Sequence, residues 1–314
     1  SVPKDPDIEG KESFEGATYV TGKWPHEGVD FTGKKVAVIG TGSSAIQAIP
    51  HIAEQASHLT VYQRTPAYSL PAGNRPLTNS EVSEMKDRYR DFREEQKYNF
   101  AGIPKPERHL EPAAMVPEEE RQRRYEQGWK EGLTGLTTKF ADVLSDETAN
   151  EGVANFIRER IKARVEDPEI AEALTPYSYP FGTKRPCLDT NFYETFNREN
   201  VTLVDLRKTP MERITPKGIE TSEGEEAYDV IVYATGFDAM TGAILNVDIR
   251  GKSGLALADK WANGPHTYLG LAIEGFPNLF TITGPSSPSV LSNMMVSIEQ
   301  HVEWVSDCIA WMRE

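Results

Sequence analysis

The sequence predicts an α/β protein built on a Rossmann-like, doubly wound parallel sheet that a helical insertion interrupts. Residues 34–47 read as an apolar strand that runs into a glycine turn and a helix. Residues 228–237 contain a continuous apolar run closed by a small-residue turn, as expected for a parallel strand buried on both faces. Between these two strands, charged residues become dense and apolar residues recur at helical spacing.

Composition limits the size, environment and partners of the protein. A chain of 314 residues exceeds one average domain, so it predicts two domains or one domain with a large insertion. The formal net charge of −14 argues against nucleic acid and against an anionic membrane surface, because both would repel the protein. The two cysteines, Cys187 and Cys308, form no CxxC pair, which indicates a reducing cytoplasm. No apolar run reaches the roughly 18 residues that a membrane span needs.

Residues 1–30 predict a connector. They are polar, punctuated by proline and glycine, and end in the sequence WPHEG at residues 24–28. The chain starts without a methionine and without the apolar core of a signal peptide. We therefore expect it to be an interior piece of a longer protein.

The turn after the first strand predicts a binding site for the pyrophosphate of a dinucleotide. Gly40 permits the tight bend, Gly42 has no Cβ to block a phosphate, and Ala45 lets the helix pack closely against the strand. The unpaired amides and the dipole of the helix start then attract the anion. Ser43 and Ser44 add hydroxyl donors. The alternative is a glycine turn without a ligand.

The next strand, residues 59–63, ends on Arg64. An acid at this position would accept hydrogen bonds from a ribose 2′-hydroxyl, whereas a guanidinium suits a 2′-phosphate. Arg64 therefore predicts a preference for NADP(H) over NAD(H).

Residues 78–175 predict a mostly helical insertion, in which Val82, Met85, Tyr89 and Phe92 follow helical spacing. We interpret its charge runs as solvated faces. The parallel sheet is expected to resume at residues 200–205, to pass through a hairpin to the strand within residues 228–237, and to be followed by another strand at residues 278–285. The closing helix has an apolar face that we expect to be buried, formed by Leu291, Met294, Met295, Ile298, Val302, Val305 and Ile309.

Five motifs occur in one order along the chain. They are GTGSS at residues 40–44, QRTP at 63–66, FGTKR at 181–185, ATGFDA at 234–239 and GPSSPS at 284–289. Together they resemble the type I Baeyer–Villiger monooxygenases, in particular the phenylacetone and steroid monooxygenase branch. The resemblance covers nearly the whole chain. It implies FAD, NADPH and O₂ as reactants, with a C4a-peroxyflavin that inserts oxygen beside a ketone carbonyl to give an ester or lactone.

The resemblance also implies roles for individual residues. Arg64, Thr65 and Lys184 would surround the 2′-phosphate, and Met294, in the loop entering the last helix, would touch the flavin. The pyrophosphate would be held by Gly40, Thr41, Gly42, Ser43, Ser44, Ala45, Ile46 and Gln47.

Arg185 would be the active-site arginine, which in the family stabilises the peroxyflavin and then the oxyanion. A guanidinium stays protonated in a dry pocket, so it supplies fixed positive charge where negative charge develops. The structural alternative is that Lys184 and Arg185 are exposed loop cations.

The sequence departs from the family in two respects. The fingerprint Phe-x-Gly-x-x-x-His-x-x-x-Trp-Pro appears at residues 14–25 with Val20 in place of histidine. Valine offers no hydrogen bond, so any coupling that the histidine provides between cofactor binding and domain movement is lost. The resemblance also implies an N-terminal FAD-binding GxGxxG domain and a C-terminal segment that closes over the substrate, and we expect both to lie outside this chain. We therefore expect the isolated chain to bind NADP(H) weakly and to have no monooxygenase activity.

This interpretation divides the chain into five segments. Residues 1–30 are the connector with the fingerprint, and 31–77 and 176–235 are the two parts of the NADP-binding Rossmann domain. Residues 78–175 are the helical insertion, and 236–314 form a partial FAD-binding domain. The expected partners are a small ketone, O₂ and the missing FAD domain of the same protein.

Other functions fit less well. A thioredoxin-reductase-like enzyme needs a CxxC pair and a short-chain dehydrogenase needs Tyr-x-x-x-Lys, and the sequence contains neither. An N- or S-oxidising flavin monooxygenase shares the two-domain plan, but Trp24-Pro25 and Lys184-Arg185 favour ketone oxidation. A catalytically inactive NADP-binding remnant is the alternative that Val20 supports. No metal site is expected, because the histidines lack ligand spacing: they are His26, His51, His58, His109, His266 and His301.

Overall fold

A computed structural model describes residues 2–103, 108–132, 134–287 and 292–314 of the chain. By its internal contacts the chain divides into two compact units. The larger unit comprises Pro3–Asn74 and Glu107–Phe237, and the smaller unit comprises Ser1–Val2, Arg75–Pro106 and Asp238–Glu314. None of the described helices has the length and hydrophobicity of a membrane span.

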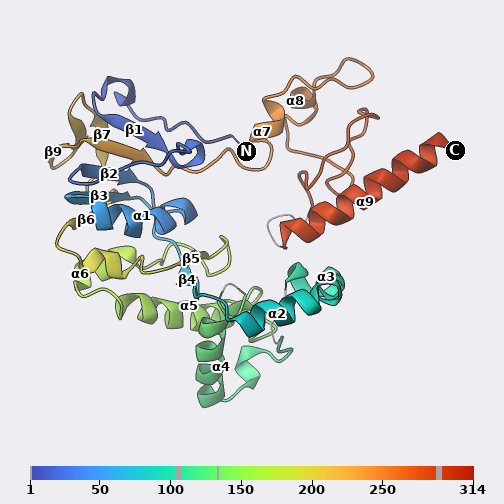
Figure 1. The fold of residues 1–314 in the computed structure, drawn as a ribbon, viewed down its shortest axis with the longest axis horizontal. Helices are drawn as coiled ribbons and strands as arrows, with labels where there is room; N and C mark the ends of the chain where they lie inside the picture. Colours follow the sequence, from blue (N-terminus) through green and yellow to red (C-terminus); the bar gives the residue numbers. More distant parts are fainter. Residues whose placement is uncertain (1, 104–107, 133, 288–291) are drawn as a thin grey trace. The chain divides into compact units, whose positions relative to one another are not determined.

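The larger unit is organised around a five-stranded parallel sheet in the order β1-β10-β2-β3-β6 (Figure 1). The order is not sequential because α1 and longer connections carry the chain between neighbouring strands, as in a doubly wound fold. The predicted Rossmann-like α/β class is therefore confirmed. The strands are β1 (Ala17–Val20), β2 (Lys35–Ile39), β3 (His58–Gln63), β6 (Val201–Asp205) and β10 (Val230–Tyr233).

The two faces of the sheet belong to two hydrophobic clusters, because successive side chains of a strand point to opposite faces. In β2, Val36 and Val38 face the main core, which contains the buried face of helix α1 (Ser43–Gln55). Ala37 and Ile39 face the second cluster. That cluster includes residues of an antiparallel sheet formed by β7 (Met211–Ile214), β8 (Gly218–Thr221) and β9 (Gly224–Ala227), which confirms the predicted hairpin.

Residues 1–30, expected as a connector, contain the edge strand of the sheet. In β1, Val20 lies opposite Tyr233 of β10 and packs against the second cluster. Trp24 stacks at 5.8 Å and 6.1 Å, between ring centroids, on Tyr19 and Phe31. Of the fingerprint residues, Trp24 therefore packs against the core of the larger unit and Val20 against the opposite face of the sheet.

A second layer lies beyond α1 in the larger unit (Figure 1). It begins with the short parallel pair β4 (Ser69–Pro71) and β5 (Cys187–Asp189), which contacts α1. The helices α4 (Glu118–Glu131), α5 (Glu147–Lys162) and α6 (Pro168–Leu174) follow. Their buried side chains join the same core as α1, so this part of the predicted helical insertion is integral to the larger unit.

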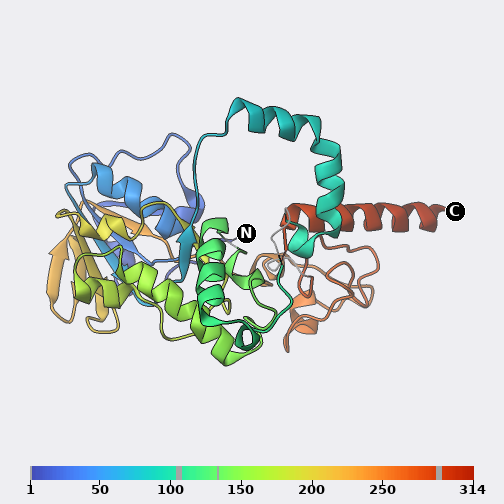
Figure 2. The ribbon, with the colours of Figure 1, turned by 90° about the horizontal axis from the view of Figure 1, so that it is seen from below.

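The smaller unit contains the remaining helices. They are α2 (Asn79–Asp87), α3 (Tyr89–Tyr98), α7 (Gly242–Leu245), α8 (Leu257–Lys260) and α9 (Met294–Arg313). Figure 2 shows the bend between α2 and α3. Thr78 and Glu81 form a capping box at the start of α2, and Arg93 of α3 forms an ion pair with Glu299 of α9. Short 3₁₀ helices in the chain lie at Lys11–Ser13, Thr21–Lys23, Phe100–Gly102, Ala113–Met115, Leu136–Thr138 and Glu194–Asn197.

Two predictions in the smaller unit are wrong. The strand expected at residues 278–285 is reduced to an isolated bridge between Phe280 and Ala272, because no described strand offers a continuous ladder of partners. The expected buried face of the last helix is largely open to solvent, with Met295 64% and Val302 47% exposed. Among the described α9 residues only His301 is buried. Leu291, predicted for this face, and residues 288–289 of the last motif lie outside the described residues.

Candidate functional site

The first position of the turn between β2 and α1, residue 40, has no room for a side chain larger than that of glycine. Gly40 has a φ of 109°, and a Cβ built on it would lie 2.7 Å from the carbonyl oxygen of Ala234. Its amide donates a 2.9 Å hydrogen bond to Tyr62 O, while Ala234 N donates to Ile39 O. The turn is therefore fixed between the ends of β3 and β10, where any side chain on residue 40 would clash with backbone.

Gly42, in contrast, leaves space that the protein does not fill. A Cβ on Gly42 would meet no described atom within 4 Å. No described side chain caps the helix here, and the first hydrogen bond of α1 runs from Ile46 N to Gly42 O. The amides of Ser43, Ser44 and Ala45 thus have no acceptor within the helix. Free donors beside an open position fit the pyrophosphate of a dinucleotide.

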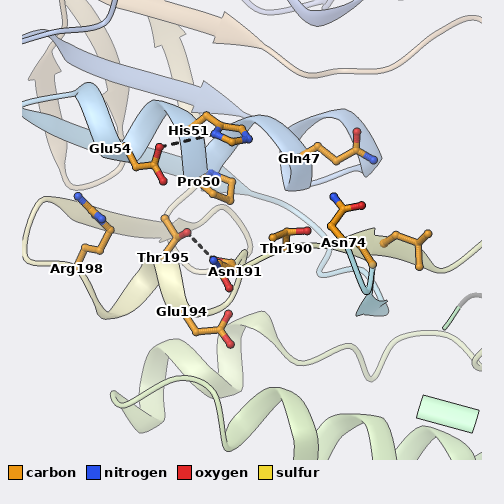
Figure 3. Close-up of a pocket in the computed structure, with 12 residues that line it drawn as sticks. Gln47, Pro50, His51, Glu54, Asn74, Thr190, Asn191, Glu194, Thr195 and Arg198 are labelled. Atoms are coloured by element: carbon orange, nitrogen blue, oxygen red, sulfur yellow. Dashed lines mark hydrogen bonds and ion pairs between the residues drawn. The ribbon is translucent and has the colours of Figure 1, made fainter. Parts of the chain in front are cut away.

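The remaining residues predicted for the pyrophosphate are distributed differently. Ser43 and Ser44 are exposed in the first turn of α1, whereas Ala45 and Ile46 are fully buried, so these two offer only their backbone. The Gln47 side chain lines a separate cavity of about 690 Å³ on α1 (Figure 3). That cavity also contains His51 of α1, and it includes neither glycine of the turn.

The predicted phosphate-binding cations line the same cavity as the turn. This cavity, which we call the dinucleotide cavity, measures about 770 Å³. Arg64 directly follows β3, next to Thr65, whose carbonyl oxygen accepts a 3.3 Å hydrogen bond from Thr41 Oγ1. The lining residues that concern the site are Gly40, Thr41, Gly42, Arg64, Thr65, Lys184 and Arg185.

Lys184 and Arg185 come from the segment before β5 and are exposed to solvent in the absence of a ligand. The Lys184 ammonium lies 4.5 Å from the centroid of the Tyr179 ring, a cation–π arrangement that fixes its direction. Cys187 also lines the cavity, and its burial raises the pKa of the thiol, although the Arg185 guanidinium acts in the opposite direction. The thiol is therefore neutral at physiological pH and does not compete for the cations.

A buried tyrosine pair joins β3 to the residues that precede β10. The Tyr62 and Tyr228 hydroxyls are 2.8 Å apart, and Tyr228 donates a 2.7 Å hydrogen bond to the Glu226 carboxylate. Burial raises the pKa of Tyr62 to about 12, with the bond to Tyr228 acting against this effect. Tyr62, which lines the dinucleotide cavity, thus contributes a neutral phenol rather than a negative charge.

Sequence reasoning missed one side of the dinucleotide cavity. Lys4 and Glu9, from the expected connector, line it. The main chain holds this segment beside the last strand, since Lys4 N donates to Gly236 O at 2.9 Å and Thr235 Oγ1 donates to Lys4 O at 3.1 Å. No motif in the sequence signals these contacts, because they join residues more than two hundred positions apart.

Met294 was expected in the loop before the last helix. It is the first residue of α9, next to the cap residue Asn293, whose side chain accepts a hydrogen bond from Met295 N. Met294 is 39% exposed within the smaller unit.

Several known monooxygenases are similar to the chain in sequence. No family model matches it. It is 42% identical, over its full length, to the 2-oxo-Δ3-4,5,5-trimethylcyclopentenylacetyl-CoA monooxygenase of Pseudomonas putida and covers 59% of that protein. It is 39% identical to the cyclohexanone 1,2-monooxygenase of an Acinetobacter species, again over its full length and 57% of that protein. A phenazine N-monooxygenase of Lysobacter antibioticus is 37% identical over 98% of the chain and 56% of its own length.

Solved structures agree with these relatives. Oxidised steroid monooxygenase bound to NADP has a TM-score of 0.94 and 48% identity over all of this chain and 60% of that one. A complex of OTEMO with FAD and NADP has a TM-score of 0.96 and 42% identity with the same coverage. The chain thus spans about three fifths of the length of the proteins that it matches.

Proposed function

We propose that the chain provides the NADPH-binding part of a Baeyer–Villiger monooxygenase, an enzyme that oxidises ketones to esters or lactones with O₂. One observation carries the proposal for this chain's own residues. The glycine turn and three cations, Arg64, Lys184 and Arg185, line a single cavity within the larger unit. A site for a dinucleotide with an additional phosphate needs this combination of amide donors and fixed cations.

The turn binds the pyrophosphate through its backbone. The amides that follow Gly42 point out of the start of α1, where the helix dipole adds partial positive charge. Ser43 and Ser44 add hydroxyl donors at the exposed end of the first turn. Gly40 contributes no bond to the ligand, but it allows the chain to turn beneath the Ala234 carbonyl.

Arg64, Thr65 and Lys184 bind the 2′-phosphate. Arg64 is placed by the end of β3, and a guanidinium can form two parallel hydrogen bonds to one phosphate. The Lys184 ammonium supplies a second cation from a distant part of the sequence, and its contact with the Tyr179 ring directs it. A dinucleotide without the 2′-phosphate would leave both cations without this partner.

Arg185 supplies permanent positive charge to the reaction. FAD, which is bound in a solved OTEMO complex and would be held largely by segments that the longer proteins add, would supply the oxygen-activating chemistry when bound. The positive charge of the Arg185 guanidinium stabilises negative charge on the reacting oxygens. Met294 contributes an apolar contact to the flavin. We place the enzyme in the cytoplasm, with a small ketone and O₂ as its substrates.

Two alternatives have specific support. The phenazine N-monooxygenase is 37% identical to this chain, which supports oxidation at nitrogen within the N- or S-oxidising alternative. Val20, where the fingerprint has histidine, supports a catalytically inactive NADP-binding remnant, since its side chain packs in a hydrophobic cluster and cannot hydrogen-bond.

A product assay separates the three functions. A protein that carries this chain with the FAD-binding segments of its relatives is given NADPH, O₂ and either a cyclic ketone or an aromatic amine. A lactone from the ketone supports the proposal, and an N-oxide alone supports the first alternative. NADPH binding without any oxygenated product supports the remnant and would overturn the proposal. The 314-residue chain by itself is expected to bind NADP(H) weakly and to form no product, and tight stoichiometric FAD in that chain would contradict this expectation.

A further inference from the structure

The segment that carries Lys184 and Arg185 contains no helix or strand of its own. Residues 181–185 run as turns and bends between α6 and β5. Gly182 has a φ of 86°, and the local backbone bond runs from Thr183 N to Pro180 O at a long 3.3 Å. Such a segment needs support from elsewhere in the fold to hold two cations at a ligand.

Asn150 of α5 provides the first support. Its side chain is 8% exposed and pairs with both backbone groups of Phe181. The Asn150 Nδ2 group donates to Phe181 O at 2.8 Å, and Phe181 N donates to Asn150 Oδ1 at 3.0 Å. A second bond from Nδ2 to Val143 O, at 2.9 Å, fixes the orientation of the amide. The segment is thereby fastened three residues before Lys184.

Arg158, two turns further along α5, provides the second support. The residue is 7% exposed, and its guanidinium donates hydrogen bonds to the Tyr68 hydroxyl at 3.0 Å and to Pro176 O at 2.9 Å. The Tyr68 ring in turn makes edge-on contacts with Tyr179 at 5.5 Å and with Phe181 at 5.4 Å, between ring centroids. Arg158 thus fixes the ring that packs against both ends of the turn.

The Tyr179 ring connects this support to the dinucleotide cavity. One edge-on neighbour is Tyr68, and the Lys184 ammonium lies 4.5 Å from the ring centroid. The Tyr179 hydroxyl donates to Pro66 O at 3.1 Å, two residues after Arg64. The Tyr179 ring therefore contacts Lys184, and its hydroxyl is hydrogen-bonded to the backbone two residues after Arg64.

We propose that α5 of the helical insertion sets the preference for NADPH over NADH, with Asn150 and Arg158 as positioning residues that hold Lys184 at the 2′-phosphate. The proposal rests on the function proposed above. Neither residue needs to touch the ligand. The insertion would therefore determine dinucleotide selectivity in addition to extending the core. Loss of its contacts with residues 181–185 would weaken the binding of NADPH and leave the binding of NADH almost unchanged.

The test is the ratio of NADH to NADPH dissociation constants, measured by equilibrium binding to the purified protein. Asn150→Ala removes the two bonds to Phe181 and should weaken NADPH by about tenfold, with less than a twofold change for NADH. Asn200→Ala is the matched control, because its amide also donates to two backbone carbonyls, those of Ala53 and Ala56, at the other end of α1. It should lower thermal stability and leave the ratio unchanged.

A double variant tests whether Asn150 acts through Lys184. If it does, Asn150→Ala combined with Lys184→Ala should weaken NADPH no more than Lys184→Ala alone. Additive losses, or an unchanged ratio in Asn150→Ala, would overturn the inference. If Asn150→Ala does not fold, Tyr68→Phe tests the same point, since it keeps the ring and removes the hydroxyl that Arg158 holds; it should lower the ratio by about threefold. A wild-type protein that binds NADH and NADPH equally would instead refute the proposed function itself.

Discussion

The backbone of Gly40 passes so close to Ala234 that a Cβ on residue 40 would lie 2.7 Å from the Ala234 carbonyl oxygen, whereas a Cβ on Gly42 would meet no described atom within 4 Å. The first glycine is thus required by the protein and the second is available to a ligand. This difference separates stability from binding at two positions of one turn.

We predict opposite results for alanine at these two glycines. Gly40→Ala combines a φ of 109° with a backbone clash, so it should lower the free energy of unfolding by about 1–3 kcal/mol. Gly42→Ala should change stability by no more than about 0.5 kcal/mol and weaken NADP(H), because the methyl group occupies the phosphate position. Thermal unfolding and equilibrium binding measure the two effects. Loss of stability in Gly42→Ala, with binding intact, would remove the turn from the site.

Arg185→Ala should slow oxygen insertion by about a hundredfold to a thousandfold while flavin reduction by NADPH continues. The guanidinium stabilises charge that develops only during oxygenation, and loss of one such fixed charge costs about 2.7–4 kcal/mol of barrier. Stopped-flow reduction and product yield in a protein with its FAD-binding segments measure the two steps. The control is Arg198→Ala, which removes a cation from the separate cavity that Gln47 and His51 line. An unchanged ester yield in Arg185→Ala would exclude this residue from the mechanism.

Val20→His should raise the fraction of consumed NADPH that appears as product. Residue 20 lies in β1, paired with Tyr233, so an imidazole there would add a hydrogen-bonding group at the edge of the sheet. Val20→Thr keeps the side-chain size and adds only a hydroxyl. If the fraction of consumed NADPH that appears as product rises in neither variant, valine at this position does not impair the reaction. The remnant alternative then loses its support.

Stability should fall between pH 10 and pH 12, in part because of Tyr62. Its pKa is about 12 in the folded chain and 10.0 in an ordinary tyrosine. Below pH 10 both states keep the proton, and above it the unfolded state ionises first, which favours unfolding by up to about 1.4 kcal/mol per pH unit. Tyr62→Phe should flatten this part of a stability curve measured by denaturant unfolding. An identical slope in both proteins would assign the alkaline loss to other groups.

The local part of the site could be predicted from sequence. Gly40, Gly42 and Arg64 lie within one strand–turn–helix–strand unit, where spacing along the chain fixes spacing in the fold, and the structure places all three at one cavity. Long-range relationships could not be predicted in this way. The approach of Ala234 to Gly40, and of Lys4 to Gly236, depends on how β10 enters the sheet.

The wrong predictions have the same origin. Residues 278–285 have the composition of a strand, yet a strand also needs a partner, and Phe280 finds only the isolated bridge to Ala272. β1 was missed for the opposite reason, because four residues of mixed polarity become an edge strand when β10 lies beside them. Gln47 stays a predicted pyrophosphate residue, and the helical period turns its side chain toward the separate cavity that it shares with His51.

The most direct test of the account compares NADPH with NADH in Arg64→Ala, using equilibrium binding. Arg207→Ala is the matched control, because Arg207 comes after the neighbouring strand β6 and is paired with Asp205. We predict that Arg64→Ala weakens NADPH by about 1.5–3 kcal/mol with little change for NADH, and that Arg207→Ala preserves the preference. An equal loss for both dinucleotides in Arg64→Ala, or none for either, would contradict recognition of the 2′-phosphate at the end of β3.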